Sequence, residues 1–266
     1  MTDAISSFLL AILQGVTEFL PVSSSGHLVL VNSFFPTDKG LLFDLVLHVA
    51  TLLSVVIYYW RDICEIFMGC IHELKPGMQR PNLYFVACLL LATLITGVIG
   101  LALNDIVETQ LRNVIIVGSL LVLNAGILWS SRKRGIFKLT TGALTLRTAA
   151  LIGLAQGLAV LPGISRSGST ITAALLMGVE SKECAKISFL LSIPVILGAL
   201  VLHIPDMAAM PVENVPVVII SAILAAVVGY VSLVLLNKVL KKANFHHFAP
   251  YCLLVGVAAI LWGIFA

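Results

Sequence analysis

The residues best suited to chemistry in this chain lie in two short polar motifs within a largely apolar sequence. The first motif, residues 14–27, reads QGVTEFLPVSSSGH, and the second, residues 156–170, reads QGLAVLPGISRSGST. At a constant offset of 142 positions, a Gln, two Gly and two Ser coincide without a gap. The first motif contributes a carboxylate and an imidazole, whereas the second contributes a guanidinium and further hydroxyls. This division predicts one shared anion-binding site and favours an enzyme that acts on a phosphate.

Three ionisable side chains stand inside the apolar stretches, namely Glu18, His27 and Arg166. Charged groups within a membrane are costly and are therefore functional candidates. Gln14 precedes Glu18 by one helical turn, so both side chains are expected on one helix face. A structural alternative is that Glu18 pairs with Arg166 only to hold the two motifs together. Such a pair would not need the hydroxyl groups around it, which favours a functional site.

Hydroxyl residues surround both motifs: Ser23, Ser24, Ser25, Ser165, Ser167, Ser169 and Thr170. Each alone could cap a helix by accepting a hydrogen bond from a free backbone N–H. Beside Arg166 they predict a phosphate-binding cradle, built from the guanidinium fork, the hydroxyls and the backbone N–H groups near Gly168. His27 follows Ser24 by three residues, and a base near a hydroxyl is typical of nucleophilic catalysis.

The composition indicates a membrane protein. Hydrophobic residues make up 59% of the 266 residues, charged residues only 11%, and the mean hydropathy is +1.08, whereas soluble domains carry about 25% charged residues. Six stretches approach the roughly 20 apolar residues that a membrane span requires: 41–60, 82–103, 113–130, 187–203, 217–236 and 248–265. Residues 62–80 are expected to be an interfacial or loop segment. The net charge of +3 is dispersed, which argues against a nucleic-acid partner.

The distribution of basic residues predicts the orientation in the membrane. Of the 16 Lys and Arg, 13 fall in the connections 61–81, 131–147, 180–186 and 237–247. Connections on the opposite side hold only Lys39 and Arg112. Because cytoplasmic loops collect basic residues, the first set is expected to face the cytoplasm and both termini to face outside.

This orientation requires each polar motif to lie in a re-entrant hairpin. Segments 4–35 and 147–180 must each begin and end on one side, and Pro21 and Pro162 are expected to end their first arms. We therefore predict an all-α polytopic membrane protein forming a single domain, 1–266, with about six transmembrane helices and two re-entrant helical hairpins. Its two inverted repeats are expected over about 1–130 and 147–266, joined by a basic cytoplasmic loop, with the site at their interface.

The two motifs resemble the signature motifs of the undecaprenyl-diphosphate phosphatase family, also called bacitracin-resistance proteins. The resemblance rests on Gln14-x-x-x-Glu18, on PVSSSGH over 21–27 and on PGISRSGST over 162–170, and the length and span pattern agree along the whole chain. The family's first motif begins with Glu or Gln, so a role needing a carboxylate at Gln14 passes to Glu18. The third Ser of the first motif is Thr in some relatives, which makes Ser24 a better nucleophile candidate than Ser25.

The resemblance implies a site, a reaction and a location. The functional residues that it implies are Glu18, Ser24, His27, Arg166 and Thr170, with Gln14 as a variable member. It implies a divalent cation, Mg²⁺ or Ca²⁺, and a bacterial cytoplasmic (inner) membrane enzyme whose site is reached from the outer side. The substrate would be a polyprenyl diphosphate lipid, which is hydrolysed to its monophosphate to recycle the lipid carrier for cell-wall synthesis.

The roles of the site residues are expected as follows. Ser24 is the candidate nucleophile, and His27 is its general base or the acid for the leaving group, although attack by His27 itself or by an activated water stays open. Glu18 would bind the metal or orient the base, and Arg166 would neutralise the phosphates. The expected substrate-binding residues are Gln14, Ser23, Ser25, Ser165, Ser167, Gly168 and Thr170. The alternative function is a polyprenyl-phosphate transporter or flippase, because inverted repeats with paired hairpins are also transporter architecture. For His48 and Asp44, four residues apart on the next predicted helix, a supporting role and a membrane-interface position are equally compatible with the sequence.

Overall fold

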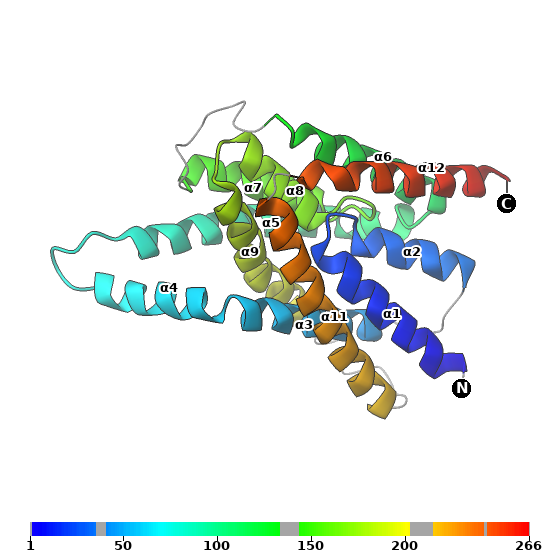
Figure 1. Cartoon of the computed structure of the whole chain (residues 1–266), viewed down its shortest axis with the longest axis horizontal. Coiled ribbons are helices and arrows are strands. Elements are labelled where there is room, and N and C mark those ends of the chain that lie inside the picture. Colours follow the sequence, from blue (N-terminus) through cyan, green and yellow to red (C-terminus); the bar gives the residue numbers. More distant parts are fainter. Residues whose placement is uncertain (1, 36–40, 134–143, 203–214, 242–243, 266) are drawn as a thin grey trace.

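The protein is built from helices and short connections. The structure, a computed structural model, describes residues 2–35, 41–133, 144–202, 215–241 and 244–265, and these contain no strand. The elements are α1 (Thr2–Phe19), α2 (Ser24–Phe34), α3 (Leu41–Tyr58), α4 (Trp60–Glu73), α5 (Pro81–Gln110), α6 (Val114–Ser130), α7 (Leu146–Leu158), α8 (Arg166–Leu176), α9 (Ser181–Leu202), α11 (Val215–Lys241), η1 (Phe245–Phe248) and α12 (Ala249–Phe265). The predicted all-α fold is confirmed (Figure 1).

Each of the six predicted spans coincides with a helix: α3, α5, α6, α9, α11 and α12. In the described parts of the chain, four segments are long and apolar enough to cross a membrane, and a fifth if the bent pair α3–α4 counts as one. The helix α6 is also apolar but has only 17 residues, slightly fewer than the roughly 20 that a span requires. The protein is therefore a multi-pass membrane protein.

Residues 62–80 were expected to be an interfacial or loop segment, and most of them form helix α4, so the loop alternative is wrong and the interfacial one stays a prediction. This helix turns by 71° from α3 at the break after Tyr58. Its Ile63 and Ile66 are partly buried against the main core, and apolar residues three apart lie on one helix face. The packing of that face explains why a helix forms in a segment that the sequence presents as a connection.

Two helical hairpins, α1–α2 and α7–α8, carry the two polar motifs. At 1.5 Å per residue, the 18 residues of α1 and the 13 of α7 are about 27 and 20 Å long, shorter than a hydrocarbon core of about 30 Å. The second arms, α2 and α8, have only 11 residues each. Figure 1 shows the hairpins opening toward opposite ends of the molecule, with their tips near its centre.

The remaining helices pack reciprocally around the hairpins. Helix α1 packs along α11, α7 packs along α5, and α6 packs along α12. A Cβ atom at Gly118 would lie 2.7 Å from the carbonyl oxygen of Gly256, and one at Gly256 would lie 2.7 Å from that of Gly118. Glycine at both positions lets the α6 and α12 backbones touch, and the relation of the two repeats stays a prediction.

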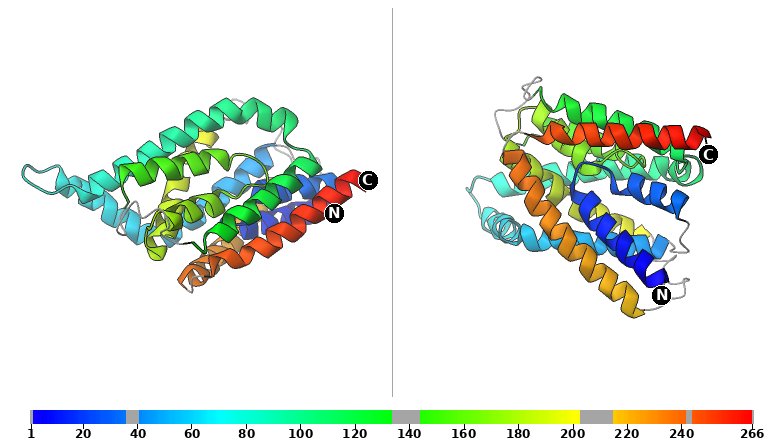
Figure 2. Two further views of the ribbon diagram at one scale, coloured as in Figure 1. Left: turned by 90° about the horizontal axis from the view of Figure 1, so that it is seen from above. Right: turned by 45° about the vertical axis from the view of Figure 1, so that its right-hand side comes forward.

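The ends of the molecule are also arranged consistently with the charge pattern. Helix α1 begins and α12 ends at the same end, and the α4–α5 connection extends from the opposite end (Figures 1 and 2). The side of the membrane that each end faces stays a prediction. The apolar core includes part of the first motif, since the ring of Phe19 packs edge-on against Phe189 of α9 at 5.5 Å.

Candidate functional site

The tips of the two hairpins are in direct contact. The Ser23 hydroxyl caps α2 by accepting from the backbone N–H of Gly26 at 3.3 Å, and it also accepts from Gly163 N–H of the other hairpin at 3.1 Å. Ser165 caps α8 by accepting from Gly168 N–H at 3.1 Å. The two caps fall at the offset of 142 that relates the motifs. The capping alternative is thus true of these two serines, and one of them also joins the tips.

The backbone at the tips has two unusual conformations. Ser23 has φ 70°, the one positive φ of a non-glycine residue in the described ranges, and Gly163 has φ 115°. Conformations of this kind persist where the surrounding contacts over-determine them, and they concentrate at functional sites. Gly163 is also confined, since a Cβ there would lie 2.7 Å from both the Leu120 Cβ and the Val117 carbonyl oxygen.

Asn124 of α6 connects the hairpins from the side. Its Nδ2 donates to the Pro21 carbonyl at 3.0 Å, and its Oδ1 accepts from Ser165 N–H at 3.1 Å. The side chain is fully buried. Sequence reasoning missed this residue. The available signal was a polar amide in the centre of the apolar stretch 113–130, where such groups are expected to bond across helices.

The Glu18 carboxylate, at the centre of the site, accepts hydrogen bonds from side chains of both hairpins. Arg166 Nη2 donates to Glu18 Oε1 at 2.6 Å, across the interface between the hairpins. The other oxygen, Oε2, accepts from the Ser24 hydroxyl at 2.7 Å. Gln14 Nε2 donates to the same oxygen at 3.1 Å. The predicted proximity of Glu18, Ser24 and Arg166 is therefore present.

The guanidinium of Arg166 keeps part of its binding capacity free. Its Nη1 is buried and has no hydrogen-bond partner among the described residues. A buried donor of this kind is costly unless a ligand satisfies it. Because Nη2 is held by Glu18, the guanidinium is fixed in orientation, and Nη1 keeps hydrogens that no described group accepts.

These groups line a cavity of about 220 Å³ where the hairpins meet helices α3 and α9. Its lining residues are Thr17, Glu18, Ser23, Ser24, Ser25, His48, Ala159, Val160, Ile164, Ser165, Arg166 and Ile196. The hydroxyls and the guanidinium make one wall polar, and the loop after α7 makes the other apolar. The cavity can thus bind an anionic head group next to an apolar chain.

His48 lines this cavity, which favours the supporting role over the membrane-interface position that the sequence left open. Its Nε2 lies 3.7 Å from Glu18 Oε2. Its Nδ1 lies 2.8 Å from the Asp44 carbonyl oxygen, which can only accept. Nδ1 therefore carries a hydrogen, and Nε2 faces the site. Asp44 contributes this backbone contact, which orients the ring.

His27 lies behind the cavity rather than beside Ser24. Its Nδ1 is 2.8 Å from the Ser23 carbonyl oxygen, and its Nε2 is 2.9 Å from the Tyr251 hydroxyl of α12. The two rings are stacked, with 4° between their planes. Sequence reasoning missed Tyr251, since a tyrosine near a helix end is also typical of a membrane interface and carries no further signal.

Of the other predicted binding residues, some line the cavity and the rest lie outside its lining. Ser25 and Ser165 line the cavity, and Gln14 is buried behind Glu18. Thr170 Oγ1 donates to the Arg166 carbonyl at 2.9 Å and lies 2.6 Å from the Ser188 hydroxyl of α9. Two further residues lie within the same hairpin and support its tip: Ser167, 3.2 Å from the Ser165 hydroxyl, and Gly168, the donor to that hydroxyl.

The side chains of the cavity do not by themselves form a metal site. In the described ranges, no three His, Cys, Asp or Glu side chains come together as metal ligands. Glu18 is the one carboxylate of the cavity, and both its oxygens already accept hydrogen bonds. Mg²⁺ and Ca²⁺ require six or more oxygen ligands. Glu18 as a metal ligand stays a prediction, and a cation bound there would have to displace one of these donors.

Fold and cavity together define a polytopic helical membrane protein with a polar cavity between two opposed hairpins. The chain belongs to the family described as Bacitracin resistance protein BacA, which it matches over residues 7–258. Relatives named Undecaprenyl-diphosphatase include one from Treponema denticola, 41% identical over 97% of this chain and 97% of its own length. Another, from Desulforapulum autotrophicum, is 38% identical with the same coverage, and one from Methanosphaera stadtmanae is 36% identical over 99% of both chains. The predicted family is confirmed.

Proposed function

We propose that this protein is a membrane phosphatase that hydrolyses undecaprenyl diphosphate, or a closely related polyprenyl diphosphate, to the monophosphate and inorganic phosphate. The observation that carries the proposal is Arg166, which lines a cavity together with several serines and whose buried Nη1 has no partner among the described residues. A fixed guanidinium fork suits a phosphate oxygen. The names of the relatives supply the substrate class. The product would re-enter cell-wall synthesis as lipid carrier.

The hydrogen bond from Ser24 to Glu18 supports a serine nucleophile. Ser24 Oγ would attack the terminal phosphorus while its proton passes to Glu18 Oε2, 2.7 Å away. The bond from that phosphorus to the bridging oxygen breaks, and the polyprenyl monophosphate leaves. Water then hydrolyses the phosphoserine and releases inorganic phosphate. Arg166 would stabilise the charge that develops on the phosphoryl oxygens.

In this proposal His27 is a positioning residue and not the base of Ser24. Because its ring nitrogens face the Ser23 carbonyl and the Tyr251 hydroxyl, it holds the turn that presents Ser24. It would have to leave Tyr251 before it could act as the base of Ser24 or attack phosphorus. His48, with Nε2 facing the cavity, is the imidazole closest to the reacting groups.

A divalent cation is proposed to enter as the counter-ion of the diphosphate. The single carboxylate of the cavity cannot complete a coordination sphere, whereas phosphate oxygens and water can. We expect calorimetric titration of Mg²⁺ into substrate-free protein to show no saturable binding, and a non-hydrolysable diphosphate to create it. Saturable binding to the substrate-free protein that Glu18→Gln abolishes would instead indicate a resident site.

The outer position of the termini is proposed from the basic residues, and it places the basic connections in the cytoplasm. The first hairpin would then enter the membrane from outside and the second from inside. The cavity lies where their tips meet, near the middle of the molecule.

The decisive experiment is phosphate release from undecaprenyl diphosphate by the purified, detergent-solubilised protein. We expect turnover that is lost in Arg166→Ala and kept in Arg132→Ala, a variant at an exposed Arg of the α6 end. The rival function, a lipid carrier, is favoured by the opposed hairpins themselves. A carrier would bind the diphosphate in an Arg166-dependent manner without releasing phosphate, and that result would overturn the proposal.

A further inference from the structure

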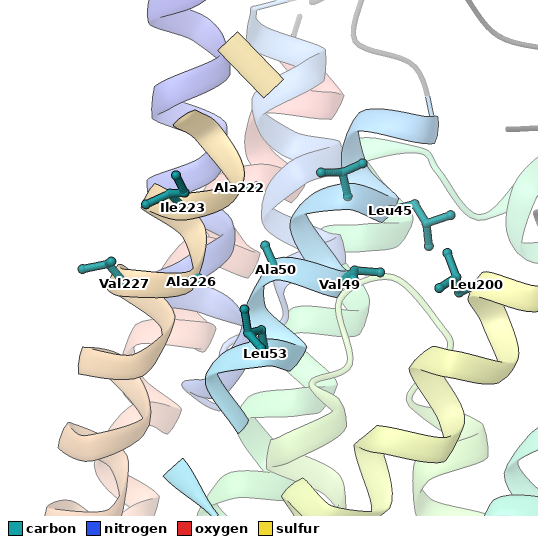
Figure 3. Close-up of a pocket in the computed structure, with 10 residues that line it drawn as sticks. Leu45, Val49, Ala50, Leu53, Leu200, Ala222, Ile223, Ala226 and Val227 are labelled. Atoms are coloured by element: carbon teal, nitrogen blue, oxygen red, sulfur yellow. The ribbon is translucent and has the colours of Figure 1, made fainter. Parts of the chain in front are cut away.

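An apolar groove of about 680 Å³ lies between α3, α9 and α11 (Figure 3). Its lining residues are Leu45, Val46, Val49, Ala50, Leu53, Leu200, Ala222, Ile223, Ala226 and Val227. All ten side chains are hydrocarbon. We propose that this groove binds the first isoprene units of the substrate chain while the diphosphate occupies the polar cavity. The inference rests on the proposed phosphatase function and deepens it.

Two helices, α3 and α9, contribute residues to both the groove and the polar cavity. On α3, Leu45 and Val49 of the groove flank His48 of the cavity. On α9, Leu200 of the groove lies one helical turn beyond Ile196 of the cavity, and residues four apart lie on the same helix face. A molecule whose charged head filled the cavity would thus have its attached chain close to the groove.

The shape of the groove follows from residue size. Its floor is made of the alanines Ala50, Ala222 and Ala226, which leave space between α3 and α11. Larger side chains form its rims, such as Leu53 and Ile223, which are 53% and 60% exposed. Figure 3 shows Ala222 and Ala226 on α11 opposite Ala50 and Leu53 on α3. The result is a channel between two helices rather than a flat lipid-facing surface.

The advantage of such a groove is orientation rather than affinity. Lipid tails are as apolar as the groove, so moving the chain from the bilayer into it yields little hydrophobic free energy. A chain held in one channel would instead fix the direction in which the diphosphate enters the cavity. Misplacement of reacting groups by about 1 Å can cost roughly 100-fold in rate. We therefore expect a blocked groove to impair long-chain substrates only.

The test compares two substrates in variants that fill the floor. Ala222→Trp should lower kcat/KM for undecaprenyl diphosphate by roughly 10- to 100-fold. Turnover of isopentenyl diphosphate, whose single isoprene unit ends near the cavity, should be unchanged. Ala258→Trp adds the same side chain at an exposed position of α12 and should affect neither substrate. If Ala222→Trp does not fold, Ala226→Phe takes its place.

Three outcomes would contradict either the groove as the binding site of the chain or the phosphatase function, and they can be told apart. An equal loss on both substrates would mean that the variant distorts the cavity, and no loss on either would mean that the groove holds bilayer lipid only. Absence of phosphate release from unsubstituted protein would overturn the phosphatase function itself. A second measurement does not need turnover: polyprenyl monophosphate with a photoreactive group in its first isoprene unit should label the α3 and α11 peptides. Labelling spread equally over α12 would contradict the groove.

Discussion

Arg166 and Glu18, 148 residues apart in the chain, form an ion pair of 2.6 Å between the two hairpin tips. Each charge is tolerated in these apolar surroundings because it is paired with the other. The pair also fixes the orientation of the guanidinium. Glu18 is simultaneously bonded to Ser24. The pair thus links the proposed nucleophile of one hairpin to the proposed anion donor of the other.

The first prediction concerns the geometry of the guanidinium. Arg166→Lys should lose at least about 100-fold in kcat/KM, because a point ammonium cannot bind Glu18 and a phosphate oxygen through separate nitrogens. Arg166→Ala should be inactive, and the unpaired buried carboxylate should cost about 3–5 kcal/mol of stability. Arg132→Lys, at an exposed Arg stacked 4.7 Å from the Trp129 ring, is the matched control. Near-normal phosphate release by Arg166→Lys would show that charge alone suffices.

The second prediction concerns the nucleophile. Ser24→Ala should lose more than the roughly 10- to 150-fold that one missing hydrogen bond of about 1.5–3 kcal/mol would cost. The double variant with Glu18→Gln should be no worse than the more damaging single variant, since losses within one catalytic unit are not additive. Ser33→Ala removes an exposed hydroxyl from the same helix. It is the matched control and should keep normal phosphate release. If Ser24→Ala lost only about 10- to 150-fold in rate, the attacking group would be water.

A third prediction concerns Asn124, which bonds to both hairpin tips. Asn124→Ala should lower the free energy of unfolding by about 2 kcal/mol or more, because it leaves the Pro21 carbonyl and the Ser165 N–H buried without a partner. Phosphate release should fall with it. Asn113→Ala removes an exposed cap from the same helix and should cost about 1 kcal/mol with activity retained. Thermal unfolding in detergent measures both, and equal effects of the two variants would contradict the linking role.

The fourth prediction concerns the left-handed backbone of the second tip. Gly163→Ala should destabilise the protein and reduce activity, because its φ of 115° is strained for alanine and the added Cβ would meet Val117 and Leu120. Gly97→Ala places the same methyl group on an exposed face of α5 with no atom within 4 Å. That control should gain about 0.5–1 kcal/mol from helix propensity. A Gly163→Ala protein with unchanged melting temperature would show that the tip can relax.

The last prediction concerns orientation. In a background without native cysteines, a cysteine at Lys133 should resist a membrane-impermeant thiol reagent in intact cells, and one at Thr109 should react. Both positions are exposed, whereas the neighbouring Ser131 is buried and would be a poor reporter. The reason is that cytoplasmic loops collect basic residues, and these are distributed 13 to 2 between the two sets of connections. The opposite labelling pattern would invert the proposed topology.

Much of the architecture could be predicted because it depends on local properties. The apolar stretches located the six long helices, and prolines near charged residues located both hairpin breaks. The short repeat indicated that the two breaks were related, and the charges at Glu18 and Arg166 indicated that they would meet. Helix α4 was not recognised, because its amphipathic pattern is stabilised by packing against the rest of the protein.

The details of the site depended on contacts between distant segments. By itself the sequence determined a multi-pass membrane protein of this family with its reactive groups in two hairpins. The tertiary structure decided that Ser24 bonds to Glu18 while His27 faces Tyr251, which is 224 residues away. It also decided that Asn124 joins the tips. Spacing along one helix predicts which side chains share a face, but a partner on another helix is chosen by how the helices pack, and no local pattern records that choice.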